Sequence, residues 1–239
     1  MLNLAISAVK DLLENIDIDG ELLVERFGGL VWAVNIPESI SETENGTPIM
    51  RDKYVPVACG TTYEQCISGN SKYSPIVPNS AYKSILYFEQ LGDATMNTTE
   101  AKFAPKGGLV VYDIPVRLVF WGSMAKLNIN GTGATECSFV APIALKIINT
   151  LYRRPGFEIA DAQYGNAKVE FIFQGQEAKD ATKVFGRYSY GKELAKFLFS
   201  PYDFFSLKYL VRLRINRNCV DAFTFGTANL CPVIGSAES

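Results

Sequence analysis

The chain has 239 residues, of which 48% are hydrophobic and 20% charged, and its net charge is −2. This composition excludes an intrinsically disordered chain, and the small net charge gives no overall attraction to nucleic acid or to an anionic membrane. The sequence contains no histidine. Ser-His-Asp and Cys-His catalysis, histidine-containing zinc sites and His-ligated haem are therefore excluded. Acid–base chemistry near neutral pH would fall to a carboxylate, cysteine, lysine or tyrosine with a shifted pKa.

The cysteines and the first residues indicate the compartment. No C-x-x-C spacing occurs among the five cysteines, so no zinc ribbon or thioredoxin-type site is predicted; they are Cys59, Cys66, Cys137, Cys219 and Cys231. An odd number of cysteines favours reduced thiols in a cytosolic setting. The first 21 residues carry Lys10, Asp11 and Glu14 within their apolar pattern and lack a basic leading region, so we expect no signal peptide. No window of 18 uncharged apolar residues predicts a membrane span.

The first half of the chain shows one helix and several short strands. Apolar residues recur at steps of three and four from Leu2 to Ile16, the pattern of an amphipathic helix. Residues 30–35 are typical of a short buried strand, which we expect Pro37 to end. Residues 38–50 are polar, acidic and rich in turn formers, so they predict a solvated loop.

Further short elements follow before the middle of the chain. Residues 54–58 predict another short strand, and residues 59–80 are irregular. Residues 84–90 favour a strand, with a short helix from Ser80 as the alternative. Residues 91–108 predict a long connection, which in a compact domain is usually functional or partly disordered.

The clearest strand is Leu109–Trp121. Its alternation places Ile114, Val116, Leu118 and Phe120 on one face and Asp113, Pro115, Arg117, Val119 and Trp121 on the other. Because proline cannot donate a ladder hydrogen bond, Pro115 predicts an edge strand or a bulge.

A Gly-rich stretch then leads into a helix over Phe139–Tyr152. Ser138 is positioned to cap this helix, and two arginines and Pro155-Gly156 suit its end. Its predicted apolar face consists of Ile143, Ile147, Ile148 and Leu151.

The last third predicts a strand over 168–174, a short helix over 190–199 and a closing strand over Leu207–Asn216. In the closing strand, the odd-numbered residues from Leu207 to Ile215 point inward and the basic residues point outward. Together these elements predict an α+β fold with a mainly antiparallel sheet, helices packed on one face and long loop insertions. We expect one domain over 1–239, with long arms at 38–80 and 91–108 and a loosely ordered tail at 220–239.

Three features are candidates for function. The basic residues of the closing strand suit a phosphate backbone or an acidic partner, although the solvated face of an edge strand has the same pattern. The aromatic residues between 185 and 209 are typical of a protein–protein anchor, although about half of them could be core. The Gly-rich stretch Asn130–Gly133 could hold an anion but lacks a phosphate-binding lysine, so a plain connection is the default.

No catalytic, cofactor-binding or metal-binding residue is predicted, since no acidic pair or cluster lies near other chemistry. The predicted residues form one candidate assembly interface, which is basic and aromatic. Its members are Arg153, Arg154, Tyr188, Tyr190, Tyr202, Phe204, Phe205, Lys208, Arg212 and Arg214.

The order of elements resembles the head–tail connector and tail-terminator proteins of tailed bacteriophages. The resemblance rests on the helix Leu2–Ile16, the strand Leu109–Trp121, the helix Phe139–Tyr152 and the closing strand Leu207–Asn216. It implies a non-enzymatic virion protein, assembled in the host cytoplasm, whose copies form a ring in the neck or upper tail. Its partners would be copies of itself and the portal, connector or tail-tube proteins, with passive contact to DNA in a central channel, no membrane and no cofactor.

Two other hypotheses remain open at this stage. One is a cytoplasmic module that binds a partner or ligand through the aromatic cluster. The other is a histidine-free enzyme, such as a Mg²⁺-dependent nucleotide or phosphate enzyme around Gly131–Gly133. Stable ring formation would distinguish the ring-forming virion protein from both of these alternatives.

Overall fold

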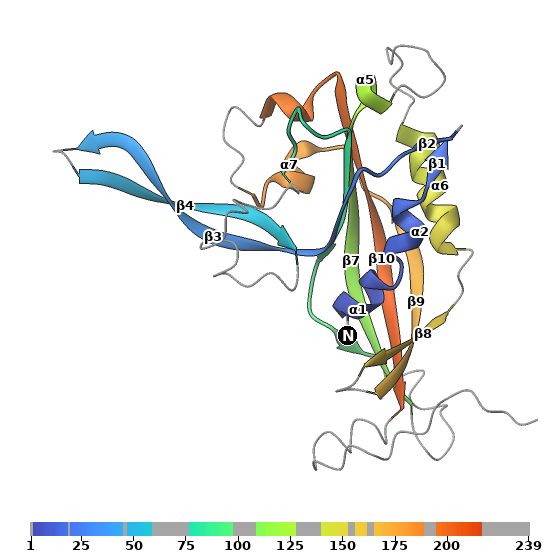
Figure 1. Cartoon of the computed structure of the whole chain (residues 1–239). Helices are drawn as coiled ribbons and strands as arrows, with labels where there is room; N and C mark the ends of the chain where they lie inside the picture. Colours follow the sequence, from blue (N-terminus) through green and yellow to red (C-terminus); the bar gives the residue numbers. More distant parts are fainter. Residues whose placement is uncertain are drawn as a thin grey trace, which may run out of the picture.

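Two long antiparallel strands, β7 (Leu109–Ser123) and β10 (Tyr202–Asn216), lie in the middle of the main sheet of the protein, seen here in a computed structural model (Figure 1). They pair without interruption from Leu109↔Asn216 to Ser123↔Tyr202. The structure describes residues 2–18, 20–44, 47–58, 77–97, 109–127, 140–152, 156–161, 165–188 and 195–216.

In the part of the chain that the structure describes, the main sheet has eight strands in the order β4-β3-β5-β7-β10-β9-β8, with the two-residue β6 (Thr95–Met96) paired to β7. All its pairings are antiparallel except the parallel pairing of β3 with β5. The other strands are β3 (Arg26–Glu44), β4 (Thr47–Ala58), β5 (Ser84–Gln90), β8 (Phe157–Asp161) and β9 (Gly165–Gln176). A separate small hairpin joins β1 (Asp17–Ile18) to β2 (Glu21–Leu22).

Helices add to this sheet, so the chain is an α+β protein with a mainly antiparallel sheet, as predicted. The predicted first helix is two short ones, with a turn at residues 8–9 between them. The others are α5, α6, α7 and the 3₁₀ helix η2. The bounds are α1 (Leu2–Ser7), α2 (Lys10–Glu14), α5 (Met124–Leu127), α6 (Val140–Tyr152), α7 (Ala181–Phe185) and η2 (Lys196–Leu198).

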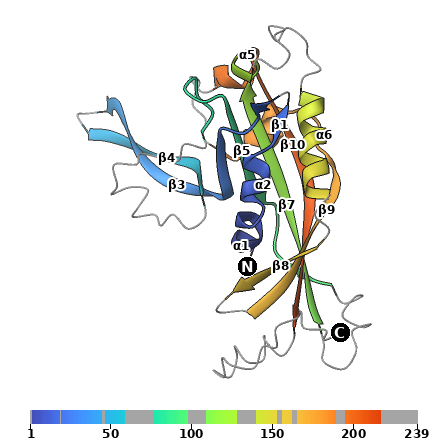
Figure 2. The same cartoon turned by 45° about the vertical axis from the view of Figure 1, so that its right-hand side comes forward.

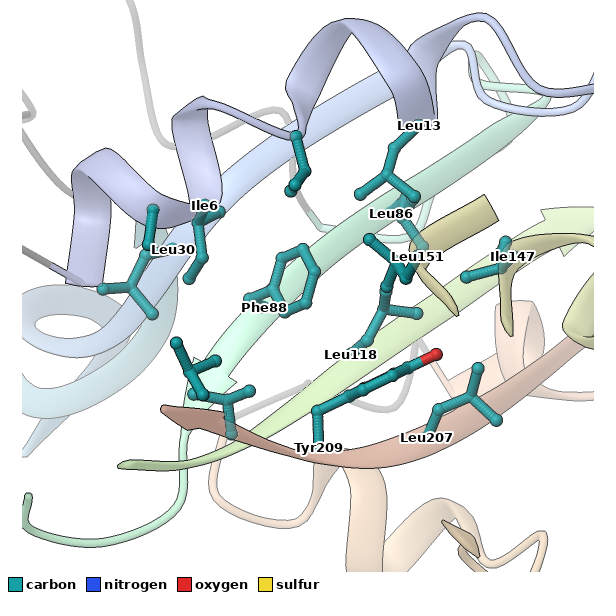
Figure 3. Close-up of a cluster of buried hydrophobic side chains, with 14 of the residues drawn as sticks. Ile6, Leu13, Leu30, Leu86, Phe88, Leu118, Ile147, Leu151, Leu207 and Tyr209 are labelled. Carbon is teal, nitrogen blue, oxygen red and sulfur yellow. The ribbon is translucent and has the colours of Figure 1, made fainter. Parts of the chain in front are cut away.

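One face of the sheet carries the larger core, into which α1, α2 and α6 pack (Figure 3). The alternation of β7 and β10 is as predicted, because Leu118 and Leu207 lie in this layer with the predicted inward residues around them. Ile147 and Leu151 of α6 face the same layer, where Phe88 of β5 also lies. The predicted apolar faces of these strands and helices are therefore confirmed.

The opposite face carries a smaller core. Val119 and Trp121 of β7 pack there with Val184 and Phe185 of α7 and with residues of β5, η2 and β10. The Trp121 indole N–H donates to the carbonyl oxygen of Phe197 at 2.5 Å. Since α7 and η2 cover this second face, the expectation that all helices pack on one face is not confirmed.

Pro115 lies in a central strand whose pairing with β10 and β5 shows no register shift, so the prediction of an edge strand or a bulge is wrong. The reason lies in the pairing on the β5 side of β7. The backbone N–H of Leu91, just after β5 ends, donates to the carbonyl oxygen of Pro115. The N–H and C=O of one residue point to the same side of an antiparallel strand. The nitrogen of Pro115 thus also faces Leu91 and points away from β10, so the proline forgoes one reciprocal hydrogen bond, to Leu91 just beyond the end of β5, and the pairing with β10 is unaffected.

The second difference is the segment predicted as a solvated loop. Residues 38–44 and 47–50 belong to β3 and β4, which pair from Val31↔Ala58 out to Glu44↔Thr47, and Pro37 lies within β3 opposite Asp52. Beyond Val31, β3 no longer pairs with β5. The two strands leave the sheet as a ribbon, which we call the arm (residues 32–44 and 47–58) (Figures 1 and 2).

Several further predictions can be compared with the structure, and some of them fall on residues outside the described ranges. The strands over 84–90 and 168–174 are confirmed, and the latter extends over 165–176. Only η2 represents the helix expected over 190–199, of which the structure describes residues 195–199. Ser138, the irregular segment 59–76 and the tail 220–239 lie outside the described residues.

Candidate functional site

The second face of the sheet carries a cluster of buried charges centred on Arg117 of β7. Register places Glu89 of β5 opposite Arg117, and Lys208 of β10 opposite it on the other side. Glu89 is 0% exposed and Arg117 is 5% exposed. The Arg117 guanidinium donates to the Oε2 atom of Glu89 from Nε at 3.0 Å and from Nη2 at 2.5 Å. Such charge-assisted bonds are among the stronger hydrogen bonds in proteins.

A segment after β9 completes this cluster. Tyr188 donates its hydroxyl hydrogen to Oε1 of Glu89, and Arg187 lies with Nη1 3.7 Å from Oε2 of Glu89. Arg117 also donates from Nη1 to the carbonyl oxygen of Lys183 at 3.0 Å. These contacts connect the segment 177–188, which includes α7, to the sheet.

Local sequence explains how this segment begins its helix. Asp180 has an extended backbone and its carboxylate accepts hydrogen bonds from the backbone N–H groups of Thr182 and Lys183. An acidic cap of this kind satisfies N–H groups that the first turn leaves without partners. The cap directs Val184 and Phe185 into the smaller core.

Glu177 extends the cluster toward solvent. Its carboxylate accepts a hydrogen bond from Ser206 at 2.7 Å and lies 3.0 Å from Lys208 Nζ and 3.3 Å from Arg117 Nη1. Burial alone would raise the pKa of Glu177, but the hydrogen bonds from Ser206 and Lys208 and the charge of Arg117 hold it below its ordinary value. For Arg117, burial alone would lower the pKa, but Glu89 and Glu177 raise it above its ordinary value. Arg117 therefore stays charged.

A second row of charges crosses β7, β10 and β9. Asp113 and Arg212 are register partners, and Arg212 Nε donates to Oδ1 of Asp113 at 2.7 Å while Nη2 donates to Oδ2 at 3.0 Å. Asn97 donates to Oδ2 at 2.9 Å. The hydrogen bond from Arg212 lowers the pKa of Asp113 below its ordinary value, burial opposes this, and the Asn97 bond lowers it further. In the same region, Arg214 lies 2.9 Å from Glu170.

These pairs change what the basic residues of β10 can do. Lys208, Arg212 and Arg214 project from the predicted face, and each has a carboxylate partner from a different strand or segment. A surface whose cations are already paired offers little net positive charge to a phosphate backbone. The arrangement therefore does not favour the hypothesis of a nucleic-acid track.

The charge cluster is also poorly placed for catalysis in this conformation. Glu89 is wholly buried and both of its oxygens accept hydrogen bonds from side chains. A general base must come within hydrogen-bond reach of a substrate proton, and burial and these side-chain partners leave neither oxygen of Glu89 exposed for such a contact. What this cluster can do is hold the segment 177–188 against the sheet.

The aromatic members of the predicted interface lie mostly inside the molecule. Tyr188, Phe204 and Phe205 are buried, and Phe204 and Phe205 belong to cores on opposite faces of the sheet. Tyr202 is half-buried and its ring stacks on Trp121 with centroids 5.3 Å apart. Arg153, Arg154 and Tyr190 lie outside the described residues. Among the predicted interface residues that the structure describes, the aromatic rings are therefore buried or half-buried, and the three cations form ion pairs.

Sequence reasoning missed Glu89, Glu177 and Asp180. A signal for the first existed, because Glu89 and Arg117 each stand within a mainly apolar strand. A charge in such a position is rarely buried without a partner. Glu177 and Asp180 lie in a polar stretch, where nothing in the local pattern distinguishes them.

Metal and membrane features are not found in the described parts of the chain. There, no group of three or more Cys, Asp or Glu side chains is arranged to hold a metal ion. None of the described helices has the length and apolarity to cross a bilayer. All five cysteines and the Gly-rich stretch Asn130–Gly133 lie outside the described residues. No protein-family model and no curated protein matches the sequence.

The charge cluster predicts a specific stability pattern. Arg117→Met should cost about 3–5 kcal/mol of unfolding free energy, because it leaves Glu89 buried without its main partner. The double variant Glu89→Gln/Arg117→Met should lose less than Arg117→Met, since no unpaired buried charge remains. Urea unfolding followed by circular dichroism measures both.

Arg214→Met is the matched control for this experiment. It removes an arginine from an ion pair that is partly exposed to solvent, so its cost should stay below about 1 kcal/mol. If Arg117→Met costs no more than Arg214→Met, the cluster does not have the structural role assigned here.

The lowered pKa of Asp113 predicts a pH dependence. A carboxylate whose folded pKa is depressed stabilises the fold above its ordinary pKa and loses this contribution as the pH falls toward the folded pKa. Asp113→Asn should therefore be less stable than wild type at pH 7, and the difference should shrink as the pH falls below the ordinary value of 3.8. Urea unfolding at a series of pH values measures this difference.

Glu158→Gln serves as the control, because Glu158 is an exposed carboxylate on β8. Its difference from wild type should stay small throughout. A constant difference between Asp113→Asn and wild type down to pH 2.5 would contradict the assignment.

Proposed function

We propose that this chain is a non-catalytic structural protein, whose copies form a ring in the neck or upper tail of a tailed bacteriophage as a connector or tail terminator. Its partners would be further copies and neighbouring virion proteins. The proposal brings together the resemblance in element order and the shape of the molecule.

The arm is the observation that carries the proposal. It extends from the sheet as two strands paired only with each other in the described part of the chain (Figures 1 and 2). A two-stranded ribbon is at best marginally stable in water by itself, and stability usually requires a third strand or packing against another element. An arm of this kind therefore suits a chain that completes its packing on assembly.

The other hypotheses receive less support. A binding module built on the aromatic cluster needs exposed rings, yet Tyr188, Phe204 and Phe205 are buried. An enzyme around Gly131–Gly133 finds no additional support, since those residues lie outside the described ranges. The arm thus favours assembly over either alternative.

Self-assembly is the direct test. Light scattering on the purified chain should give a mass that is a multiple of the single-chain mass and that rises with concentration. Negative-stain electron microscopy of the same sample should show closed rings with a central hole. A single-chain mass over the whole accessible concentration range would contradict the proposal.

A further inference from the structure

The arm joins the sheet through a short length of β3 that follows an irregular stretch. The register of β3 against β5 shifts between Phe27 and Leu30, as it does at a β-bulge. After the shift, β3 and β5 share two further register pairs, Leu30↔Phe88 and Val31↔Glu89. The arm begins at the next residue, so we call Leu30 and Val31 the root of the arm.

Gly29 supplies the backbone conformation of this bulge. Its φ is +66°, in the left-handed region that glycine adopts without strain and that β-branched residues rarely adopt. A Cβ atom at this position would meet nothing within 4 Å, so the conformation and not the available space explains the glycine. A bulge bends its strand and increases the local twist. The direction in which β3 leaves the sheet therefore depends on the backbone at Gly29.

Both cores hold the root of the arm. Leu30 belongs to the larger core and Val31 to the smaller core, on the opposite face of the sheet. In the smaller core, Val31 lies with Val184 and Phe185 of α7. The segment 177–188 thus contributes to the same core as the last residue before the arm.

The charge cluster lies in the same row of the sheet as Val31. Register partners on adjacent strands are direct neighbours across the ladder. One such row crosses five strands, from β4 to β10, in the order Ala58↔Val31↔Glu89↔Arg117↔Lys208. Glu89 stands in the middle of this row, between the root of the arm and the guanidinium of Arg117.

The segment 177–188 fixes Glu89 in this position. Tyr188 donates to Oε1 of Glu89, and Arg117, which also contacts the backbone of α7, donates to Oε2. Glu89 is the next to last residue of β5, so these bonds hold the end of the strand with which Val31 pairs. Moving this end would break hydrogen bonds of a buried carboxylate, which costs more than breaking those of a neutral group.

We infer that the charge cluster clamps the root of the arm, so that the bulge at Gly29 directs the arm in one fixed orientation. This inference rests on the proposed function, for which it names the device that presents the arm to the next copy. A ribbon that swings at its root loses more conformational entropy on docking than one that is already oriented. The clamp therefore favours assembly without itself contacting the next copy.

Hydrogen exchange followed by mass spectrometry tests the clamp on the full chain, diluted until light scattering gives the single-chain mass. Tyr188→Phe removes the hydrogen bond to Oε1 of Glu89 and keeps the ring. Because the root opens only when the cluster opens, the amides of the root and of the adjacent part of the arm (residues 30–36 and 53–58) should exchange at least about tenfold faster in this variant.

Asp113→Asn is the matched control for this experiment. It also weakens a hydrogen-bonded ion pair of β7, but in the row of Arg212 and not in that of Glu89. Both variants should speed exchange in the β7–β10 ladder, because both lower the stability of the whole fold. Tyr188→Phe alone should speed exchange at the root. An equal effect of the two variants at the root, or no effect of Tyr188→Phe there, would overturn the clamp.

Substitution of Gly29 tests the direction of the arm. Gly29→Val places a β-branched residue at a φ of +66°, so the bulge must rearrange. Gly29→Asn is the matched control, because asparagine tolerates the left-handed region. Gly29→Val should weaken self-association at least about tenfold in light scattering, while Gly29→Asn should associate like wild type. Circular dichroism should show that both variants keep the fold.

The outcomes separate this inference from the proposed function. If wild type forms rings and Gly29→Val assembles as wild type does, the orientation of the arm at the bulge is irrelevant to assembly, and this inference is wrong while the ring proposal stands. A wild-type chain that stays single at every concentration would contradict the ring proposal. The exchange experiment would then still decide whether the cluster clamps the root, because it is made on single chains.

Discussion

The uninterrupted ladder between β7 and β10 is the constraint on which the rest of the structure depends. Because side chains alternate along each strand, this one ladder determines the content of both faces of the sheet. The even positions of β7 and the odd positions of β10 create the surface for α1, α2 and α6. The alternate positions create the surface for α7 and bring the charges together. A register shift of one residue would exchange the two faces and place Arg117 under the helices.

The charge cluster follows from this alternation and explains how α7 is held in place. Burying Arg117 costs a large desolvation energy, which two carboxylates and two backbone carbonyls on its guanidinium offset. The carbonyl groups belong to Lys183 and Val184, so the arginine contacts the backbone of α7 directly. In this way a polar group within a mainly apolar strand determines where the segment 177–188 lies.

Much of the fold was predictable from local pattern, and the differences have physical reasons. The faces of β7, β10 and α6 followed from periodicity, since each is long enough for one period to dominate. The arm was not predicted because residues 38–50 combine acidic and small polar side chains with a proline, Pro48, and follow directly on Pro37. Asn45-Gly46, a dipeptide typical of a two-residue hairpin connection, was the signal that could have revealed it. Pro37 predicted the end of a strand, and Pro115 predicted an edge strand or a bulge. Both lie inside strands, because the neighbour that the proline nitrogen faces decides whether proline fits there.

The site was less predictable than the fold because its contacts join distant parts of the sequence. Arg117 meets Glu89 and Glu177, which are 28 and 60 residues away. The basic residues of β10 were visible in the sequence, but their partners Asp113 and Glu170 lie on two other strands. Only the sheet order reveals that the basic row is neutralised. The burial of Phe204 and Phe205 has the same origin, since each faces a different core.

Assembly through the arm is the central claim of this account, and a reconstruction of the assembled particle by electron cryomicroscopy tests it most directly. The account predicts a closed ring in which the arm of each copy contacts an adjacent copy. A particle whose arms point into solvent and contact no neighbouring copy would contradict it.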